Sequence, residues 1–325
     1  MNRLWILFAA ALLAAGLMSC RKTPAPTTPD SSSRRFRIAV IPKGANQVYW
    51  KSVHAGAVKA SRELGVEVIW KGPLKEDDRE SQIKVMEDFI AAAVDGIVLA
   101  PLDDTALRPA VHASVAQGIP VVIIDSALQS DRYVSFVATD NYAGGRKAAA
   151  RMADLLQRRG RVIVFRFLEG SASTEQRVQG FLDALKEWPD LAVASSSQRS
   201  GATAEVAYQN AENLLAQFKK PSGIEIDGVF CPNEFTTFAM LRALQDGGLA
   251  GQVKFVGFDS SEMLVAAMKK GDIHGLVLQD PITMGYLGVK TMIQHLKREP
   301  VDRRIDTGST VATPENMGQP EVRAL

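Results

Sequence analysis

Polar side chains follow three apolar runs of this chain, at positions where they could bind a hydroxylated ligand. Asp125 and Asp259 each come directly after an apolar run typical of a buried strand, and Asn233 follows a third such run. Carboxylates accept hydrogen bonds and amides both donate and accept them, which suits ligand hydroxyl groups. Open α/β sheets bind ligands just past the carboxyl ends of their strands. The spacing therefore predicts a polar-ligand site rather than a catalytic one.

The segment that contains Asn233 and Asp259 has a second, similar copy earlier in the chain. Residues Asp227–Ser260 and Asp95–Ser126 both pass through Asp-Gly, an apolar run, a polar break containing proline, a helix-like stretch ended by glycine, and a second apolar run closed by Asp-Ser. The same strand-helix-strand unit written twice indicates two similar domains.

Apolar runs and helix-like stretches alternate along most of the chain. Near-continuous apolar runs are typical of parallel strands covered on both faces, so the pattern predicts an α/β fold with parallel sheets. The predicted strands are Phe36–Ile41, Val66–Trp70, Ile97–Ala100, Val121–Ile124, Val134–Ala138, Arg161–Phe167, Leu191–Ala194, Val229–Cys231, Val253–Phe258 and Ile273–Leu278.

The composition is that of an ordinary globular protein. The 325 residues are 46% hydrophobic and 23% charged, and Lys and Arg exceed Asp and Glu by two. This length suits two domains of about 100–150 residues each. The near balance of charge gives no reason to expect nucleic acid as a partner.

Few residues favour an enzyme, a metal or a cofactor. The four histidines are isolated and lack metal-ligand spacing, and the sequence contains no nucleophile elbow, P-loop or dinucleotide-binding glycine motif. We interpret Cys231 as a small buried apolar residue rather than a nucleophile. Paired carboxylates leave a glycoside-acting enzyme as a minor alternative. We expect no cofactor and no metal.

The chain begins with a predicted secretory signal. Arg3 precedes the apolar run Leu4–Met18, and Ser19 and Cys20 follow it. The order Leu17-Met18-Ser19-Cys20 resembles a bacterial lipobox, which implies cleavage before Cys20 and a lipid attached to it. The alternative is an uncleaved N-terminal anchor. Residues 21–35 are rich in Pro, Ser and Thr and predict a flexible tether.

Six phrases in register carry a family resemblance, which runs from about Phe36 to the C-terminus. They are RIAVIPKGANQVYWKSVHAGAVKAS, ATDNYAGG, QRVQGF, VFCPNE, VGFDS and VLQDPITMG. In this order they resemble the ribose-binding-protein-like group of periplasmic sugar-binding components of ABC importers, whose fold is shared with the effector domains of LacI-type repressors.

The resemblance implies the type I periplasmic binding protein fold, with two doubly wound parallel-sheet domains joined by a three-strand hinge. The crossings would fall near Thr139-Asp140, Gln279-Asp280 and Thr307–Ser309. Residues 36–139 and 280–307 would form the N-terminal lobe, and residues 140–279 and 308–325 the C-terminal lobe. Sugar would bind in the cleft between them, and binding would close the hinge.

The resemblance also implies ligand contacts. For some of these residues a purely structural role stays open. Asp125, Asp259 and Asn233 could instead cap helices. One of Tyr49 and Trp50 could belong to the hydrophobic core, and Gln279 could serve only the hinge. The aromatic rings would offer flat apolar surface to sugar C–H groups. The implied contacts are Asn46, Tyr49, Trp50, Asp125, Asn233, Asp259 and Gln279.

Two departures argue against ribose itself. Glu175 stands where the ribose pattern has an arginine, and Gly201-Ala202 stands where it has an aromatic residue. Arg199 or Lys43 could supply the missing cation, while Arg177 is expected to form a structural salt bridge. Asp140 and Asn141 are expected to cap a helix at the hinge.

The carboxylates decide the expected ligand class. Asp125, Glu175, Asp259 and a nearby Glu234 would repel an anion, so a neutral monosaccharide or polyol fits best, with a cationic or amino sugar as a minor alternative. We predict a monomeric lipoprotein outside the cytoplasm, anchored through Cys20, that passes its ligand to an ABC permease. The alternative is a sensor subunit for a membrane receptor kinase. A repressor is disfavoured because the leader occupies the place of a DNA-binding motif.

Overall fold

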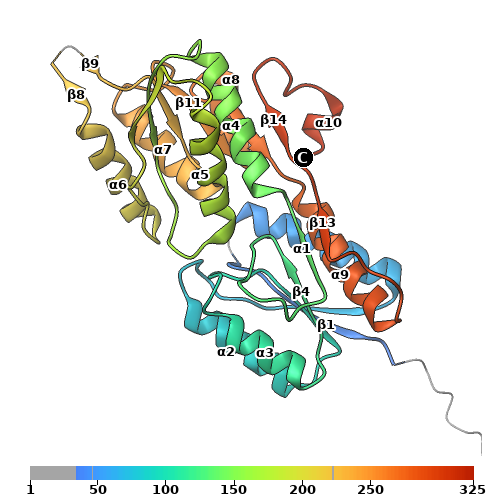
Figure 1. Cartoon of the computed structure of the whole chain (residues 1–325). Coiled ribbons are helices and arrows are strands. Elements are labelled where there is room, and N and C mark those ends of the chain that lie inside the picture. Colours follow the sequence, from blue (N-terminus) through green and yellow to red (C-terminus); the bar gives the residue numbers. More distant parts are fainter. Residues whose placement is uncertain (1–33, 46, 222) are drawn as a thin grey trace, which may run out of the picture. The chain divides into compact units, whose positions relative to one another are not determined.

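The computed structural model describes residues 34–325 except 46 and 222, and two six-stranded sheets form their framework (Figure 1). The first sheet has the strand order β13-β5-β4-β3-β1-β2 and is parallel throughout. The second has the order β14-β12-β11-β10-β6-β7 and is parallel except where β14 joins β12. The two sheets therefore share one strand order and differ only in the direction of the edge strands β13 and β14, and the predicted α/β fold with two doubly wound sheets is confirmed.

Strands β1 to β7 and β10 to β12 agree closely with the predicted apolar runs. Strands β13 and β14, beside the third predicted crossing, are absent from those runs, and so is the pair β8 and β9. That pair is a short antiparallel ribbon separate from both sheets. The bounds are β1 Arg37–Ile41, β2 Glu67–Trp70, β3 Gly96–Leu99, β4 Val121–Ile124, β5 Ser135–Ala138, β6 Gly160–Val164, β7 Leu191–Ser195, β8 Lys219–Lys220, β9 Gly223–Ile224, β10 Gly228–Phe230, β11 Lys254–Phe258, β12 Gly275–Leu278, β13 Arg304–Asp306 and β14 Thr310–Ala312.

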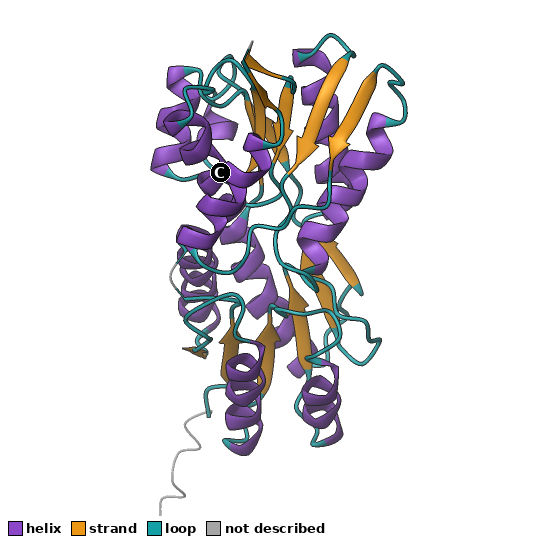
Figure 2. Ribbon diagram, turned by 90° about the vertical axis from the view of Figure 1, so that its left-hand side faces the viewer, coloured by secondary structure: helices purple, strands orange, loops and turns teal. Residues whose placement is uncertain are grey.

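Helices cover both faces of each sheet, as Figure 2 shows. Each sheet has one buried apolar cluster on either face, which explains why its central strands carry apolar residues on both sides. The helices are α1 Val48–Leu64, α2 Arg79–Ala91, α3 Arg108–Ala116, α4 Asn141–Leu155, α5 Ala172–Leu185, α6 Ala204–Ala216, α7 Glu234–Asp246, α8 Glu262–Lys270, α9 Pro281–Leu296 and the short α10 Pro320–Arg323.

Three links pass between the two sheets. The chain leaves the first sheet after β5, returns to it from β12 through α9, and crosses again between β13 and β14. At the first link the Asp140 carboxylate accepts the Ala143 N–H at 2.9 Å and so caps α4, as the sequence predicts. At the second, Asp280 caps α9 through the Thr283 N–H, with Pro281 in the first helical position.

The predicted signal peptide (residues 1–20), with Cys20, and the tether up to residue 33 lie outside the described residues. Within the described part of the chain, no helix is long and apolar enough to cross a membrane.

Glycines let one pair of helices beside each sheet pack at close range. A Cβ on Gly56 of α1 would lie 1.9 Å from the Ile282 carbonyl oxygen of α9, and one on Gly285 would lie 2.0 Å from the Val53 carbonyl oxygen. Gly145 of α4 likewise faces α5, where a Cβ would meet the Arg177 carbonyl oxygen at 1.9 Å. A backbone atom cannot swing aside as a side chain can, so these contacts tolerate only glycine.

Gly56→Ala should lower the free energy of unfolding by about 2–3 kcal/mol, because α1 and α9 must move apart to admit the methyl group. Urea denaturation would measure the loss. Gly318→Ala is the matched control, since a Cβ there has no neighbour within 4 Å, and it should change stability by less than about 1 kcal/mol. Equal losses in the two variants would contradict the packing argument.

Candidate functional site

One pocket receives side chains that follow strands of both sheets, at the carboxyl ends of those strands. It encloses about 410 Å³ of space not filled by atoms, part of it open to solvent. We call it the inner pocket. Its lining residues are Lys43, Gln47, Tyr49, Trp50, Glu76, Asp125, Phe167, Ser171, Ser173, Thr174, Arg177, Asn233, Glu234, Phe235, Asp259 and Gln279.

On the side of the first sheet, Asp125 holds two other lining residues. Its Oδ2 lies 2.7 Å from the Lys43 Nζ, in an ion pair whose side chains are each 5% exposed. Its Oδ1 accepts the Tyr49 hydroxyl at 3.0 Å. Lys43 also donates to the Ser173 Oγ at 3.1 Å, on the helix that follows β6 of the second sheet. Both carboxylate oxygens of Asp125 are thus engaged by protein groups, and the residue positions Lys43 and Tyr49.

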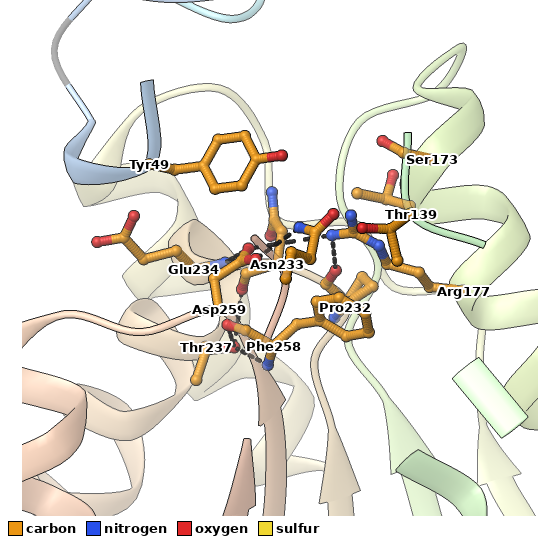
Figure 3. A network of polar contacts seen from close by, with 12 residues as sticks. Tyr49, Thr139, Ser173, Arg177, Pro232, Asn233, Glu234, Thr237, Phe258 and Asp259 are labelled. Atoms are coloured by element: carbon orange, nitrogen blue, oxygen red, sulfur yellow. Dashed lines mark hydrogen bonds and ion pairs between the residues drawn. The ribbon is translucent and has the colours of Figure 1, made fainter. Parts of the chain in front are cut away.

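On the side of the second sheet, Asp259 is the centre of a similar group (Figure 3). Its Oδ1 accepts the Gln279 amide at 2.6 Å, and its Oδ2 accepts the Glu234 backbone N–H at 3.1 Å. The Arg177 Nη1 lies 3.9 Å from that Oδ2 and donates to the Pro232 carbonyl at 2.9 Å. In Figure 3 the Tyr49 ring lies over this network.

Asp125 and Asp259 occupy equivalent places, after β4 and β11. Both have a left-handed backbone, with φ of 63° and 64°. Few residues other than glycine adopt this conformation, although Asp and Asn tolerate it best, and it often marks functional positions. Neither residue caps the helix that follows it, since Asp140 caps α4 and Ser261 caps α8. Sequence reasoning left capping of the following helix open for both, and the structure removes it; Asp259 instead accepts the N–H of Glu234, the first residue of α7.

Arg177 is connected to both sides of the pocket. Its Nε donates to the Asn141 Oδ1 at 2.8 Å, and the Asn141 amide nitrogen lies 3.3 Å from the Asp125 carbonyl oxygen. The guanidinium also lies over the Phe258 ring, 4.0 Å from its centroid. Asn141 therefore orients Arg177, and Asp140 alone provides the cap that the sequence assigned to both residues.

Aromatic rings form the apolar part of the wall. Trp50 is buried, contacts Tyr49 edge-on and donates its indole N–H to the Glu76 carboxylate. On the other side Phe167 and Phe235 make an edge-to-face pair with centroids 5.7 Å apart. Such rings suit the C–H faces of a sugar. Trp50 lines the pocket and also belongs to the hydrophobic core, so it has both of the positions that the sequence left open, one at the ligand site and one in the core.

Unpaired polar atoms gather in this pocket. Among the described residues, the buried side-chain polar atoms without a hydrogen bond all belong to lining residues. One of them, the Asp125 Oδ2, is ion-paired with Lys43. The other five are Gln47 Oε1, Ser171 Oγ, Arg177 Nη2, Glu234 Oε2 and Gln279 Oε1.

These five atoms define what the pocket can bind. The Gln47 and Gln279 oxygens and the ionised Glu234 carboxylate can only accept, Arg177 can only donate, and the Ser171 hydroxyl can do either. Gln279 is fixed in this orientation because its amide nitrogen must face the Asp259 carboxylate. A buried polar atom left bare costs about 1–3 kcal/mol. The matching ligand therefore offers at least three donors and one acceptor, which a polyhydroxylated molecule does.

The charges of the pocket oppose an anion. Four carboxyl groups, those of Glu76, Asp125, Glu234 and Asp259, face the cations Lys43 and Arg177. Burial raises the pKa of Asp259 against the opposing effect of Arg177, and burial raises that of Glu76 against the effect of Lys43. Burial and the neighbouring Asp259 raise the pKa of Glu234 to about 7. Adding a further negative charge would be costly.

The raised pKa of Glu234 predicts a pH dependence of stability. Its ordinary value is 4.5, so the folded state holds this proton more tightly than the unfolded state. The stabilisation is fully present below the unfolded pKa and is lost as pH rises through about 7. Between pH 8 and pH 5, the wild type should gain about 1–2 kcal/mol relative to Glu234→Gln, a value reduced for partial solvent exposure. Urea denaturation at each pH would measure both proteins. If their free energies of unfolding changed equally between pH 8 and pH 5, the prediction for Glu234 would be contradicted.

The structure brings most of the predicted residues together. Lys43, Tyr49, Trp50, Asp125, Asn233, Asp259 and Gln279 line the inner pocket. Asn233 also caps α7, with its Oδ1 accepting the Thr236 N–H at 3.1 Å. Asn46 lies outside the described residues.

Glu175 and Arg199 lie beside the inner pocket rather than in its wall. They line a wider adjoining space, which we call the outer chamber. On the side of the first sheet it is lined by Arg79 and Asp103, and on the side of the second sheet by Glu175, Arg199 and Gly201. The Glu175 Oε1 accepts from Arg199 at 2.7 Å, and Arg166 binds its other oxygen. Glu175 is therefore already neutralised by two arginines.

Sequence reasoning missed several lining residues. It assigned Arg177 to a structural salt bridge, whereas the guanidinium also exposes an unpaired donor to the pocket. It did not name Glu76, Phe167 or Phe235 as site residues, although they also line the pocket. The sequence signal that could have indicated a pocket role for Arg177 is the phrase QRVQGF, which contains it and is part of the family resemblance.

The amino-acid sequence of this chain is similar to a known protein family and to named binding proteins. Residues 38–300 match the family described as periplasmic binding protein domain. The chain is 26% identical to the ribose import binding protein of Bacillus subtilis, covering 89% of this chain and 92% of that protein. It is also 26% identical to the D-ribose/D-allose-binding protein of Pseudomonas aeruginosa, covering 93% and 95%.

Solved structures extend this likeness. A carbohydrate transporter solute binding protein from Agrobacterium radiobacter, in complex with D-arabinose, is 35% identical with a TM-score of 0.85, covering 90% of this chain and 99% of that one. An ABC transporter solute binding protein from Agrobacterium vitis with bound D-fucose is 34% identical with a TM-score of 0.84, covering 89% and 99%.

Proposed function

Because this chain belongs to the periplasmic binding protein domain family, we propose that it is the substrate-binding subunit of an ABC sugar importer. It captures a neutral monosaccharide, a polyol or a close derivative in the inner pocket and passes it to a permease in the membrane. It acts as a monomer and performs no covalent chemistry. The family and its named relatives are binding proteins, which supports this assignment.

The observation that carries the proposal is the set of five unpaired polar atoms in the inner pocket. Sugar hydroxyls donate and accept, so a single small molecule can satisfy all of them at once. The excess of carboxyl groups disfavours sugar acids and phosphates. D-arabinose and D-fucose, bound by two similar proteins, have the neutral, hydroxylated chemistry that this lining calls for.

We propose that closure of two lobes forms the site. Residues 36–139 with 280–307 make the N-terminal lobe, and residues 140–279 with 308–325 make the C-terminal lobe, with the three inter-sheet links as the hinge. The bonds from Lys43 to Ser173 and from the Ser173 N–H to the Ser126 Oγ, at 3.1 and 3.0 Å, join the lobes in the closed form. Ligand that bridges the lobes favours this form.

Ligand contacts follow from the same argument. We assign direct contact to Gln47, Ser171, Arg177, Glu234 and Gln279, which have unpaired atoms. Tyr49, Trp50 and Phe167 supply apolar surface, while Lys43, Asn233 and Asp259 complete the polar wall. Asn46 is assigned contact on the family resemblance alone.

We propose that the protein works outside the cytoplasm, tied to a membrane by lipid on Cys20. The leader and the lipobox-like sequence before Cys20 support this. Metabolic labelling with palmitate should mark the wild type and leave Cys20→Ala unlabelled. Labelling that survives the substitution would refute the anchor and leave the binding function untouched.

A thermal-shift panel of neutral sugars and polyols tests the binding function. A ligand that binds only the folded state stabilises it by RT ln(1 + [L]/Kd), about 2.7 kcal/mol at a hundredfold excess over Kd. We expect one or a few compounds to raise the melting temperature by several degrees, while uronic acids and sugar phosphates do not. A panel without any shift would contradict the proposal.

A further inference from the structure

The inner pocket opens into the outer chamber through a portal of four residues. Lys43, Glu76, Phe167 and Ser171 line both spaces. The outer chamber has about 1810 Å³ of atom-free space, part of it open to solvent, against about 410 Å³ for the inner pocket. A molecule seated in the inner pocket could therefore extend past this portal.

The chamber remains although the lobes already touch across it. The Arg79 Nη2 donates to the Glu169 carbonyl at 2.8 Å, and the Asp104 N–H donates to the Gly170 carbonyl at 3.0 Å. Gly170 is so close that a Cβ there would lie 2.3 Å from the Asp103 Oδ2. Further closure at this rim is sterically blocked, so the chamber is a built feature of the closed form.

The loop before α6 keeps the chamber open. Gly201 lines it with φ of +83°, and a Cβ there would meet the Val206 side chain at 2.6 Å. Any side chain at this position would be strained both in its backbone and in its packing. Position 201 therefore projects no side chain into the chamber.

The walls of the chamber indicate what could enter. Acidic side chains outnumber basic ones by six to three, which disfavours an anionic group. Glu175 is paired with two arginines, and Asp103 with Arg79 at 2.8 Å, so these charges require no ionic partner. Phe167 at the portal offers an apolar surface to a sugar ring. A neutral hydroxylated unit matches this combination.

We propose that the ligand carries a second neutral sugar unit, joined through a glycosidic bond at the end that faces the portal, and that this unit occupies the outer chamber. The inference rests on the proposed function and narrows its substrate class from a free monosaccharide to a glycoside or disaccharide. The inner pocket binds one unit through its unpaired atoms, and Lys43 and Glu76 flank the glycosidic oxygen.

Calorimetric titration of the full chain tests the inference with two matched sets of probes. The first set is D-glucose, D-galactose, D-xylose and L-arabinose; the second is maltose, cellobiose, lactose, melibiose, xylobiose and arabinobiose. We expect at least one disaccharide to bind tenfold or more tightly than either of its component sugars. Monosaccharide binding without such a disaccharide would overturn the inference and leave the proposed function intact. Absence of binding in both sets would also overturn the inference, while the thermal-shift panel of neutral sugars and polyols decides the proposed function.

A bulky side chain in the chamber provides the structural test. Ala172 lines the chamber and not the inner pocket, so Ala172→Trp should weaken disaccharide binding tenfold or more and change monosaccharide binding less than threefold. Ala192→Trp on an exposed position of β7 is the matched control and should alter neither. Unchanged disaccharide affinity in Ala172→Trp would overturn the placement. The wild-type comparison decides the ligand class even where a variant fails to fold.

Discussion

Asp259→Asn is expected to lower ligand affinity about 100-fold while the protein stays folded. The carboxylate accepts from Gln279 and from the Glu234 N–H and attracts Arg177, and these residues carry unpaired atoms that face the ligand. A hydrogen bond to a charged group contributes about 1.5–3 kcal/mol, and about 1.4 kcal/mol is tenfold in Kd. The amide would preserve the side-chain shape and tolerate the left-handed backbone.

Calorimetric titration with the best compound of the thermal-shift panel would measure this loss. Asp190→Asn, at an exposed position, is the matched control and should leave the affinity unchanged. If Asp259→Asn kept the wild-type Kd, Asp259 would be a structural residue and not part of the binding network.

Arg177→Met should both abolish measurable binding and lower the free energy of unfolding by about 3 kcal/mol. The side chains of Arg177 and Asp259 are only 2% and 8% exposed, so removal of the cation leaves a buried carboxylate without a neighbouring positive charge. The substitution also removes the bonds to Asn141 and Pro232. Among the unpaired pocket atoms of the described residues, it removes the one that can only donate. Methionine keeps much of the apolar stem.

Arg242→Met gives the contrast for this experiment. Arg242 and Asp246 form a pair 3.8 Å apart on the surface of α7, with side chains 53% and 50% exposed. Pairs of this kind contribute about 0–1 kcal/mol, so urea denaturation should show little change and binding should be normal. If Arg177→Met and Arg242→Met lowered the free energy of unfolding equally, burial would not explain the large cost expected for Arg177→Met.

The repeated unit made most of the fold predictable. Asp95–Ser126 and Asp227–Ser260 became β3-α3-β4 and β10-α7-β11, which have equivalent places in the two sheets. Because ligands bind past the carboxyl ends of parallel strands, Asp125 and Asp259 could each be assigned to the binding edge of its own sheet, and the family resemblance placed both edges at one cleft. The ribbon of β8 and β9 was missed because it is too short to leave a hydrophobic period.

Partners distant in sequence limited the prediction of the site. Nothing local to Asp125 shows that Lys43 and Tyr49 engage both of its oxygens. Arg177 lies within α5, where a charged residue usually faces solvent, and only the packing of α5 turns it inward. Glu76 lies in a charged stretch, and its contact with Trp50 arises from the fold of the loop after β2. Residues at strand ends were predictable for a topological reason that residues on helices lack.

A crystal structure of the protein with its tightest-binding neutral sugar would test the central claim most directly. The claim predicts that the sugar lies in the inner pocket, with hydroxyl groups within about 3.2 Å of the Gln47, Glu234 and Gln279 oxygens and an acceptor at the Arg177 Nη2. A sugar bound at another surface, or one seated in the pocket while these four atoms remain unpaired, would contradict it.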